Sequence, residues 1–101
     1  MTRKATETLV QTTWMADDAL FACHDNVTDV DWNEIESKVY SGIYSPEEVT
    51  LISVFAYLSG YDQMDSVSLF DVGQLDQMEK LAVLDALRIH WSGVPLEENL
   101  V

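Results

Sequence analysis

The sequence predicts an all-α protein, a compact bundle of four main helices with room for a short fifth, around a central apolar helix at about residues 46–59. Three observations predict this fold class. First, no charged residue occurs between Glu48 and Asp62, although 18 of the 101 residues are acidic. Second, apolar residues recur at helical spacing in the other long segments. Third, helix start and stop signals separate these segments from one another.

The central segment carries the clearest signals. Ser45 can cap a helix, Pro46 suits the first helical position, and Glu48 completes an S-x-x-E capping box. Gly60 suits the left-handed residue at which many helices end. Apolar residues cover roughly 220° of the circumference at about 100° per residue, so we expect other helices to surround this one. The polar remainder is Thr50, Ser53 and Tyr57.

The first predicted helix runs from about Ala5 to Asp25, after a flexible tail at about residues 1–5. Two apolar stripes follow its length. Either another helix covers the second stripe, or its aromatic side chains are exposed anchors for a partner. The main stripe is Leu9, Ala16, Leu20, Cys23 and Val27, opposite an acidic ridge of Glu7, Asp18 and Asp25, and the second stripe is Val10, Trp14 and Phe21.

The next helix is predicted to start after Asp31, because Glu34 follows it at capping-box spacing. Gly42 predicts its end. The buried stripe of this helix would be Trp32, Ile35 and Val39.

The last third of the chain is expected to hold one short and one long helix. Residues 66–72 alternate like a strand, but a lone strand has no pairing partner, so a single helical turn is favoured. The long helix spans about residues 74–92 and should pack on two sides, because it has two apolar stripes. Residues 95–101 are expected to be a flexible tail. The stripes are Leu75, Met78, Ala82, Ala86 and Ile89, and Leu84, Leu87 and Trp91.

Length and composition indicate one domain over residues 1–101, and a hydrophobic content of 48% argues for a folded core. The single cysteine, Cys23, excludes an intramolecular disulfide and cannot form a zinc site alone. No apolar run suits a signal peptide or a membrane helix. We therefore expect a soluble cytoplasmic protein, in the host cytoplasm if a phage encodes it.

The formal net charge is −13, from 18 acidic and 5 basic residues. Direct binding to nucleic acid or to an anionic membrane is therefore not expected. A basic protein is the natural partner for such a surface. The alternative is that the acidity only maintains solubility or reflects a halophilic source.

No stretch carries a catalytic, metal or cofactor motif. Residues 29–33 imitate the start of a calcium loop, but Glu34 and Tyr40 stand where a glycine and a bidentate glutamate are needed. Cys23 and His24 are adjacent, so on a helix they point about 100° apart and cannot act on one substrate. We expect no enzymatic activity, no cofactor and no metal.

The acidic side chains are better understood as a binding surface. A DNA duplex carries one charge per about 1.7 Å of axis, and carboxylates shared among several helices can approach that density. They would replace phosphates against Lys and Arg of a partner, with Trp14 or Trp32 as a desolvated anchor. Glu47 and Glu48 should contribute least, because they favour the positive end of the central helix. The predicted partner-binding residues are Glu7, Trp14, Asp17, Asp18, Phe21, Asp25, Asp29, Trp32, Glu34 and Glu36.

In size, acidity and lack of a catalytic motif, the chain resembles phage-borne inhibitors of restriction and CRISPR systems, including DNA-mimic proteins. The resemblance concerns the profile of the whole chain and assigns no individual residue. It implies a stoichiometric inhibitor that blocks the nucleic-acid-binding surface of a basic partner. Two alternatives stay open: an antitoxin or immunity protein that neutralises a basic nuclease, and a homo-oligomeric module joined through the second apolar stripes of the first and last helices.

Overall fold

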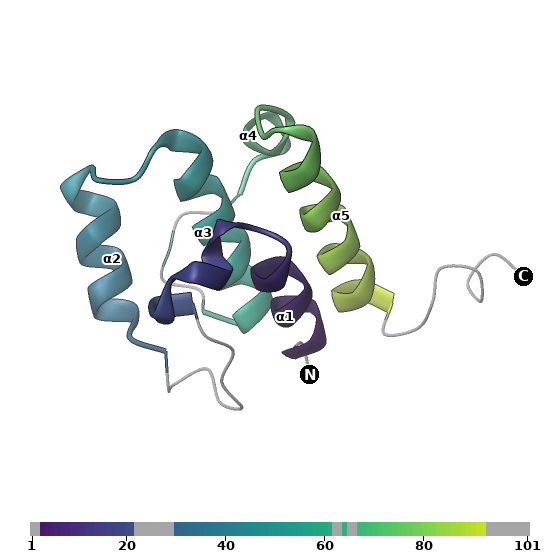
Figure 1. The fold of residues 1–101 in the computed structure, drawn as a ribbon, viewed down its shortest axis with the longest axis horizontal. Helices are drawn as coiled ribbons and strands as arrows, with labels where there is room; N and C mark the ends of the chain where they lie inside the picture. Colours follow the sequence, from purple (N-terminus) through teal and green to yellow (C-terminus); the bar gives the residue numbers. More distant parts are fainter. Residues whose placement is uncertain (1–2, 22–29, 62–63, 65–66, 93–101) are drawn as a thin grey trace, which may run out of the picture.

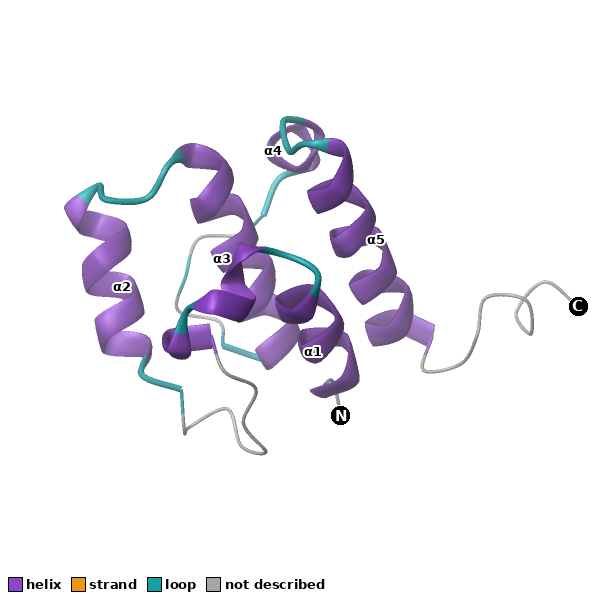
Figure 2. Ribbon diagram, in the orientation of Figure 1, coloured by secondary structure: helices purple, strands orange, loops and turns teal. Residues whose placement is uncertain are grey.

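A computed structural model describes residues 3–21, 30–61, 64 and 67–92 of the chain. Within these ranges the regular elements are helical and none is a strand (Figures 1 and 2), which confirms the predicted all-α class. The elements are α1 (Arg3–Gln11), the 3₁₀ turns η1 (Trp14–Asp17) and η2 (Ala19–Phe21), α2 (Trp32–Ser41), α3 (Pro46–Ser59), α4 (Leu69–Gly73) and α5 (Gln77–Ser92).

Helix α3 is the centre of the bundle, as predicted. Ser45 Oγ accepts a hydrogen bond from the N–H of Glu48 at 3.2 Å, and Glu48 Oε1 accepts one from the N–H of Ser45 at 2.8 Å. Gly60 ends the helix in the left-handed conformation, with φ 83°. Helices α1, α4 and α5 pack against α3. Its buried side chains are Leu51, Ile52, Ser53, Val54, Phe55, Ala56 and Leu58.

After α1 the chain does not continue as a helix, so the single helix predicted for residues 5–25 is wrong. The hydroxyls of Thr12 and Thr13 donate hydrogen bonds to backbone carbonyls one turn back, at 2.7 and 2.9 Å. Thr13 then caps η1 by accepting a hydrogen bond from the N–H of Met15. Such bonds offer the backbone an alternative to the helical ladder, and the chain turns back on itself here.

This turn changes which residues of the first segment are buried. Leu9 is buried as predicted, but Ala16 of the same predicted stripe is exposed. Phe21 is fully buried, with its ring 5.3 Å from that of Phe55 in an edge-to-face arrangement. Cys23 and Val27 lie outside the described residues, and α1 begins at Arg3, inside the segment expected to be a tail.

Helix α2 follows the prediction closely. The Asp31 carboxylate accepts a hydrogen bond from the N–H of Glu34 at 3.1 Å, and Gly42 ends the helix with φ 82°. Trp32 stacks on Tyr61, with ring centroids 4.2 Å apart and planes inclined by 1°. This stack joins the start of α2 to the end of α3.

The region after α3 contains the single helical turn expected at residues 66–72, found as α4. Helix α5 starts at Gln77 rather than at residue 74, because Asp76 and Glu79 form a capping pair: the N–H of Glu79 donates to Asp76 at 2.8 Å and the N–H of Asp76 donates to Glu79 at 3.3 Å. The predicted tail at residues 95–101 lies outside the described residues.

The prediction that both stripes of α5 are covered is wrong. Ala82 and Ala86 are buried, but Met78 from the first stripe is 71% exposed, and Leu84 and Trp91 from the second are 60% and 67% exposed. Helix α5 lies at the outer edge of the bundle, opposite α2, so α1 and α3 cover only one side of it (Figure 1).

Candidate protein-binding surface

Carboxylates from three separate elements gather around Tyr44, in the link between α2 and α3. Tyr44 is half-buried, with its ring 5.9 Å from that of Trp14. Burial raises the pKa of its phenol, and the negative charges of Asp18, Glu48 and Glu34 raise that pKa further. The three carboxylates therefore act on one point of the surface, although they belong to the η1–η2 link, α3 and α2.

A second group of carboxylates surrounds Glu79 at the start of α5. Burial raises the pKa of this carboxyl most, the hydrogen bond from the backbone of Asp76 lowers it, and the charges of Asp76, Glu47 and Glu48 raise it. Glu48 belongs to both groups, so the two groups join. We call the joined set the acidic surface; it consists of Asp18, Glu34, Glu47, Glu48, Asp76 and Glu79.

The acidic surface combines free and structural carboxylates. Glu34, Glu47 and Asp76 are exposed, and Asp76 is also structural because it accepts a hydrogen bond from the N–H of Glu79 at 2.8 Å. Asp18 and Glu48 are half-buried and accept hydrogen bonds from the backbone, at 3.0 Å from the N–H of Leu20 and at 2.8 Å from that of Ser45. The structural carboxylates fix the negative potential in place, and the exposed ones can reach a partner.

The predicted acidic contacts fall into three groups. Asp18 and Glu34 belong to the acidic surface, and Asp17 beside it is exposed. Glu7 is half-buried on α1, and Glu36 is half-buried on α2, where it accepts a hydrogen bond from the hydroxyl of Tyr61. The remaining two predicted acids, Asp25 and Asp29, lie outside the described residues.

The predicted aromatic anchors are interior residues. Phe21 has no exposed surface and Trp32 is 8% exposed, so neither can contact a partner in this fold. Trp14 is half-buried, with its ring edge-to-face with Phe21 at 5.4 Å. Val10, the third member of the predicted second stripe, is also buried. The hypothesis that this stripe is an exposed anchor is therefore wrong for Val10 and Phe21. Trp14 stays partly exposed and packs against Phe21 and Tyr44.

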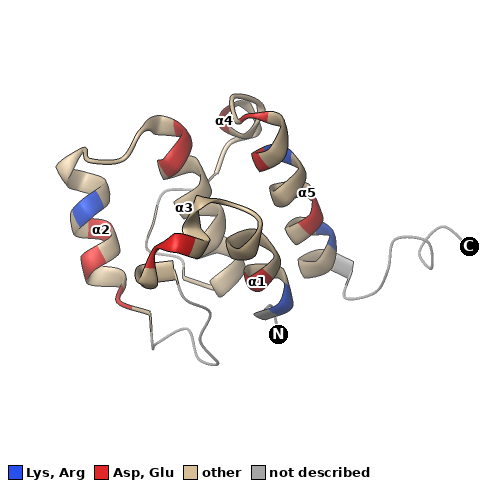
Figure 3. Cartoon of the chain, viewed as in Figure 1, with Lys and Arg blue, Asp and Glu red and all other residues tan. Residues whose placement is uncertain are grey.

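Figure 3 shows acidic positions on α1, η1, α2, the start of α3 and α5. From the sequence, Glu47 and Glu48 were expected to contribute least to partner binding, and Asp76 and Glu79 were not among the predicted contacts. Glu48 belongs to the S-x-x-E capping box at residues 45–48, and Asp76 and Glu79 form the D-x-x-E box at residues 76–79, so these signals are present in the sequence. The sequence does not show that the charges of Glu47 and Glu48 act on Glu79.

Other chemistry has little support within the described parts of the chain. No group of three or more His, Cys, Asp or Glu side chains there is arranged to hold a metal ion. No helix among the described residues is long and apolar enough to span a membrane.

A groove of about 620 Å³ lies between α3, α4 and α5, and its walls are mainly apolar. Residues that line it include Val54, Met64, Val72, Val83, Leu87 and Trp91.

Comparison with known proteins gives no relative. No protein-family model, curated protein or solved structure matches the chain.

Proposed function

We propose that this protein is a small non-enzymatic inhibitor that binds a basic, nucleic-acid-handling protein and blocks its nucleic-acid-binding surface. The observation that carries the proposal is the joined acidic surface, in which carboxylates from the η1–η2 link, α2, α3 and α5 reinforce one another's negative potential. The whole chain adds to this potential, with a net charge of −13.

The electrostatics of the surface favour a cationic partner. Carboxylates close enough to raise the pKa of a neighbouring group repel one another, and a Lys or Arg side chain placed among them relieves that repulsion. A surface that attracts phosphate groups carries the same Lys and Arg side chains, so it is complementary to this one. The partner is thus a protein whose own ligand is a nucleic acid.

The first experiment uses the purified chain as bait for proteins from the cells in which it acts. The captured protein is then bound to its DNA or RNA, and the chain is titrated into that complex. We expect displacement at a ratio of one chain per binding site, and weaker displacement as the salt concentration rises from about 50 to 500 mM. Capture that neither nucleic acid nor salt weakens would contradict the proposal.

Two matched charge reversals locate the binding surface. Glu47→Lys and Asp71→Lys each reverse an exposed carboxylate in the first turn of a helix, α3 and α4 respectively, so they change the net charge and the helix ends alike. Only Glu47 belongs to the acidic surface. We expect Glu47→Lys to weaken partner binding at least about tenfold and Asp71→Lys to weaken it much less. Equal losses would show that net charge alone, and not this surface, drives binding.

Tyr44 provides a reporter inside the acidic surface. Its pKa is raised partly by Asp18, Glu48 and Glu34, and cations from a bound partner would offset those charges. The absorbance of ionised tyrosine should therefore appear at lower pH in the complex than in the free chain. A Tyr44→Phe variant identifies this contribution among the other tyrosines.

A further inference from the structure

Helix α5 carries a stripe of exposed apolar side chains, and Trp91 at one edge of it donates a hydrogen bond to the hydroxyl of Tyr57 on α3. Leu81, Leu84 and Trp91 are 51%, 60% and 67% exposed, and the half-buried Arg88 lies between the last two. The opposite side of the helix packs on α1 and α3. We call Leu81, Leu84, Arg88 and Trp91 the α5 stripe.

The spacing of the α5 stripe is that of a helix-pairing seam. Its members follow one another at intervals of three, four and three residues, as the a and d positions of a heptad do. At 100° per residue they fall within about 80° of the helix circumference. A second helix could therefore contact all of them at once.

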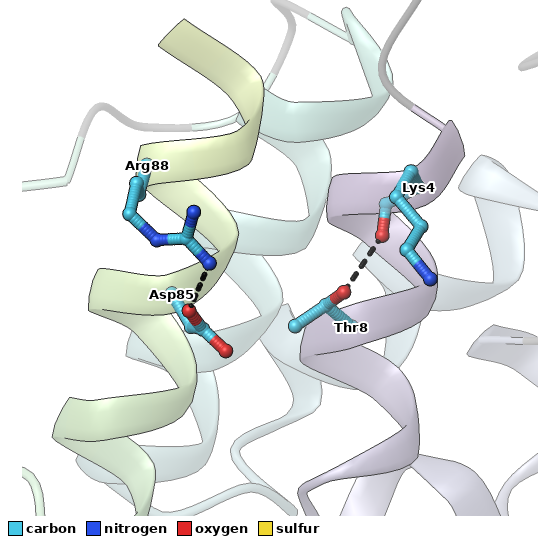
Figure 4. A network of polar contacts seen from close by, with 4 residues as sticks. All are labelled: Lys4, Thr8, Asp85 and Arg88. Carbon is cyan, nitrogen blue, oxygen red and sulfur yellow. Dashed lines mark hydrogen bonds and ion pairs between the residues drawn. The ribbon is translucent and has the colours of Figure 1, made fainter. Parts of the chain in front are cut away.

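The charge on α5 differs from that of the rest of the chain. Its acidic residues Glu79 and Asp85 are balanced by Lys80 and Arg88, so this helix is formally neutral in a protein of net charge −13. Arg88 Nη2 lies 2.7 Å from Asp85 Oδ1 on α5, and Figure 4 shows this pair together with Lys4 and Thr8 of α1. Two copies of this acidic chain therefore repel each other least where the α5 stripes meet.

We propose that two copies of the chain pair through their α5 stripes, with the two α5 helices antiparallel and a two-fold axis near Ala86. The stripe is self-complementary in this arrangement. Leu81 faces Trp91 of the second copy, and Leu84 faces the aliphatic part of Arg88. Each Asp85 also comes within reach of Arg88 of the second copy, so the ion pair within one helix becomes a network across two.

The available area fits a weak dimer. Tyr57, whose hydroxyl accepts a hydrogen bond from Trp91 Nε1 at 2.8 Å, and Met78 flank the stripe and are 47% and 71% exposed. These six side chains can each lose at most on the order of 100 Å², so two copies together bury at most about 1,200 Å², the lower end of the range for specific interfaces. We expect a dissociation constant in the micromolar range.

Sedimentation equilibrium from about 10 µM to 1 mM tests the pairing. We expect a monomer–dimer equilibrium that strengthens with added salt, because salt screens the repulsion between two chains of like charge. Leu84→Glu should weaken the dimer at least tenfold. Ile43→Glu is the matched control, since Ile43 is 62% exposed but lies between α2 and α3, and it should leave the dimer intact.

Leu81→Glu repeats the test at a second position, and far-ultraviolet circular dichroism confirms that each variant is folded. A protein that stays monomeric at about 1 mM would overturn the proposal, as would equal weakening by Leu84→Glu and Ile43→Glu.

Cysteine cross-linking tests the antiparallel direction, in a background in which Cys23 is replaced by Ser. Positions 81 of the two copies lie about 15 Å apart along the pair, whereas position 81 of one copy lies level with position 91 of the other. A mixture of Leu81→Cys and Trp91→Cys proteins should form a mixed disulfide, and each protein alone should not. Self-linked disulfides from each protein alone would indicate a parallel pair and overturn the arrangement.

Discussion

Helices α3 and α5 start with the same kind of capping box, but their surroundings in the fold differ. Each starts with a capping box, Ser45 with Glu48 and Asp76 with Glu79, and each has apolar residues on more than one side. Helix α3 is enclosed, because α1, α4 and α5 pack around it together with aromatic rings from the N-terminal segment and α2. Helix α5 is covered on one side only. Apolar residues on more than one side of a helix predict that several of its sides are buried. Only the arrangement of the other helices shows whether the same chain buries them.

The largest expected effect is at the centre of α3. Phe55 is 1% exposed, and its ring lies 5.3 Å from Phe21 and 5.6 Å from Trp32, so it joins three segments of the chain. Phe55→Ala should lower the free energy of unfolding by about 3 to 5 kcal/mol, because it leaves a cavity where these segments meet. Urea denaturation measures this loss. A loss below about 1 kcal/mol would mean that α3 is not the centre of the core.

The same substitution in the two helices tests the comparison directly. Leu58 on α3 has no exposed surface, whereas Leu84 on α5 is 60% exposed. Leu58→Ala should cost about 2 to 5 kcal/mol, and Leu84→Ala should change stability by less than about 0.5 kcal/mol. Both are measured at a protein concentration well below the dissociation constant of the proposed dimer, so that self-association does not contribute. Similar losses at the two positions would show that the outer side of α5 is covered within one chain.

Local signals in the sequence predicted most of the fold. The caps at Ser45 and Asp31 and the stops at Gly42 and Gly60 act over a few residues, and each lies where the sequence placed it. The prediction of one helix over residues 5–25 was wrong, because the apolar spacing there is also compatible with a shorter helix followed by 3₁₀ turns. The chain turns at Thr13, whose side chain caps η1, and a hydrophobic period carries no information about such a cap.

The candidate surface was less predictable than the fold. The acidity is evident from composition, and the structure adds that the charges of Asp18 and Glu34, two of the predicted contacts, both act on Tyr44. Whether they bind a partner stays a prediction. Phe21 and Trp32 were selected for their residue type, and they are interior. The charges of Glu47 and Glu48 act on Glu79 because of how α3 and α5 are placed in the fold, and no local sequence pattern encodes that placement.

The caps of α3 and α5 should contribute equally to the free energy of unfolding. The two helices would then differ in how they are packed and not in how they start. Ser45→Ala removes the oxygen that accepts from the N–H of Glu48, and Asp76→Ala removes the one that accepts from the N–H of Glu79. Each should lower the free energy of unfolding by about 1 kcal/mol. Thermal and urea unfolding of the two variants measure this. A much larger loss for Asp76→Ala would mean that α5 depends on its end more than on its packing.

The smallest expected effect concerns Glu79 at the start of α5, which the charges at the start of α3 influence. The pKa of Glu79 is raised by burial and by the charges of Asp76, Glu47 and Glu48, so the folded chain binds the proton of Glu79 more tightly than the unfolded chain does. The resulting stabilisation is fully present below the unfolded pKa, and it is lost as pH rises through the folded pKa. Ionised Glu79 thus works against the folded state.

Glu79→Gln should remove this dependence, because the amide oxygen can still accept a hydrogen bond from the N–H of Asp76 but carries no charge. Relative to the native chain, the variant should gain stability as pH rises through the carboxyl range, from about 4 to 6. Urea denaturation at several pH values measures the gain, with Asp71→Asn as a control at an exposed carboxylate on α4. Parallel stability curves for the native chain and Glu79→Gln would mean that neither burial nor the neighbouring charges raise the pKa of Glu79, and the link between the two groups of the acidic surface would lose its support.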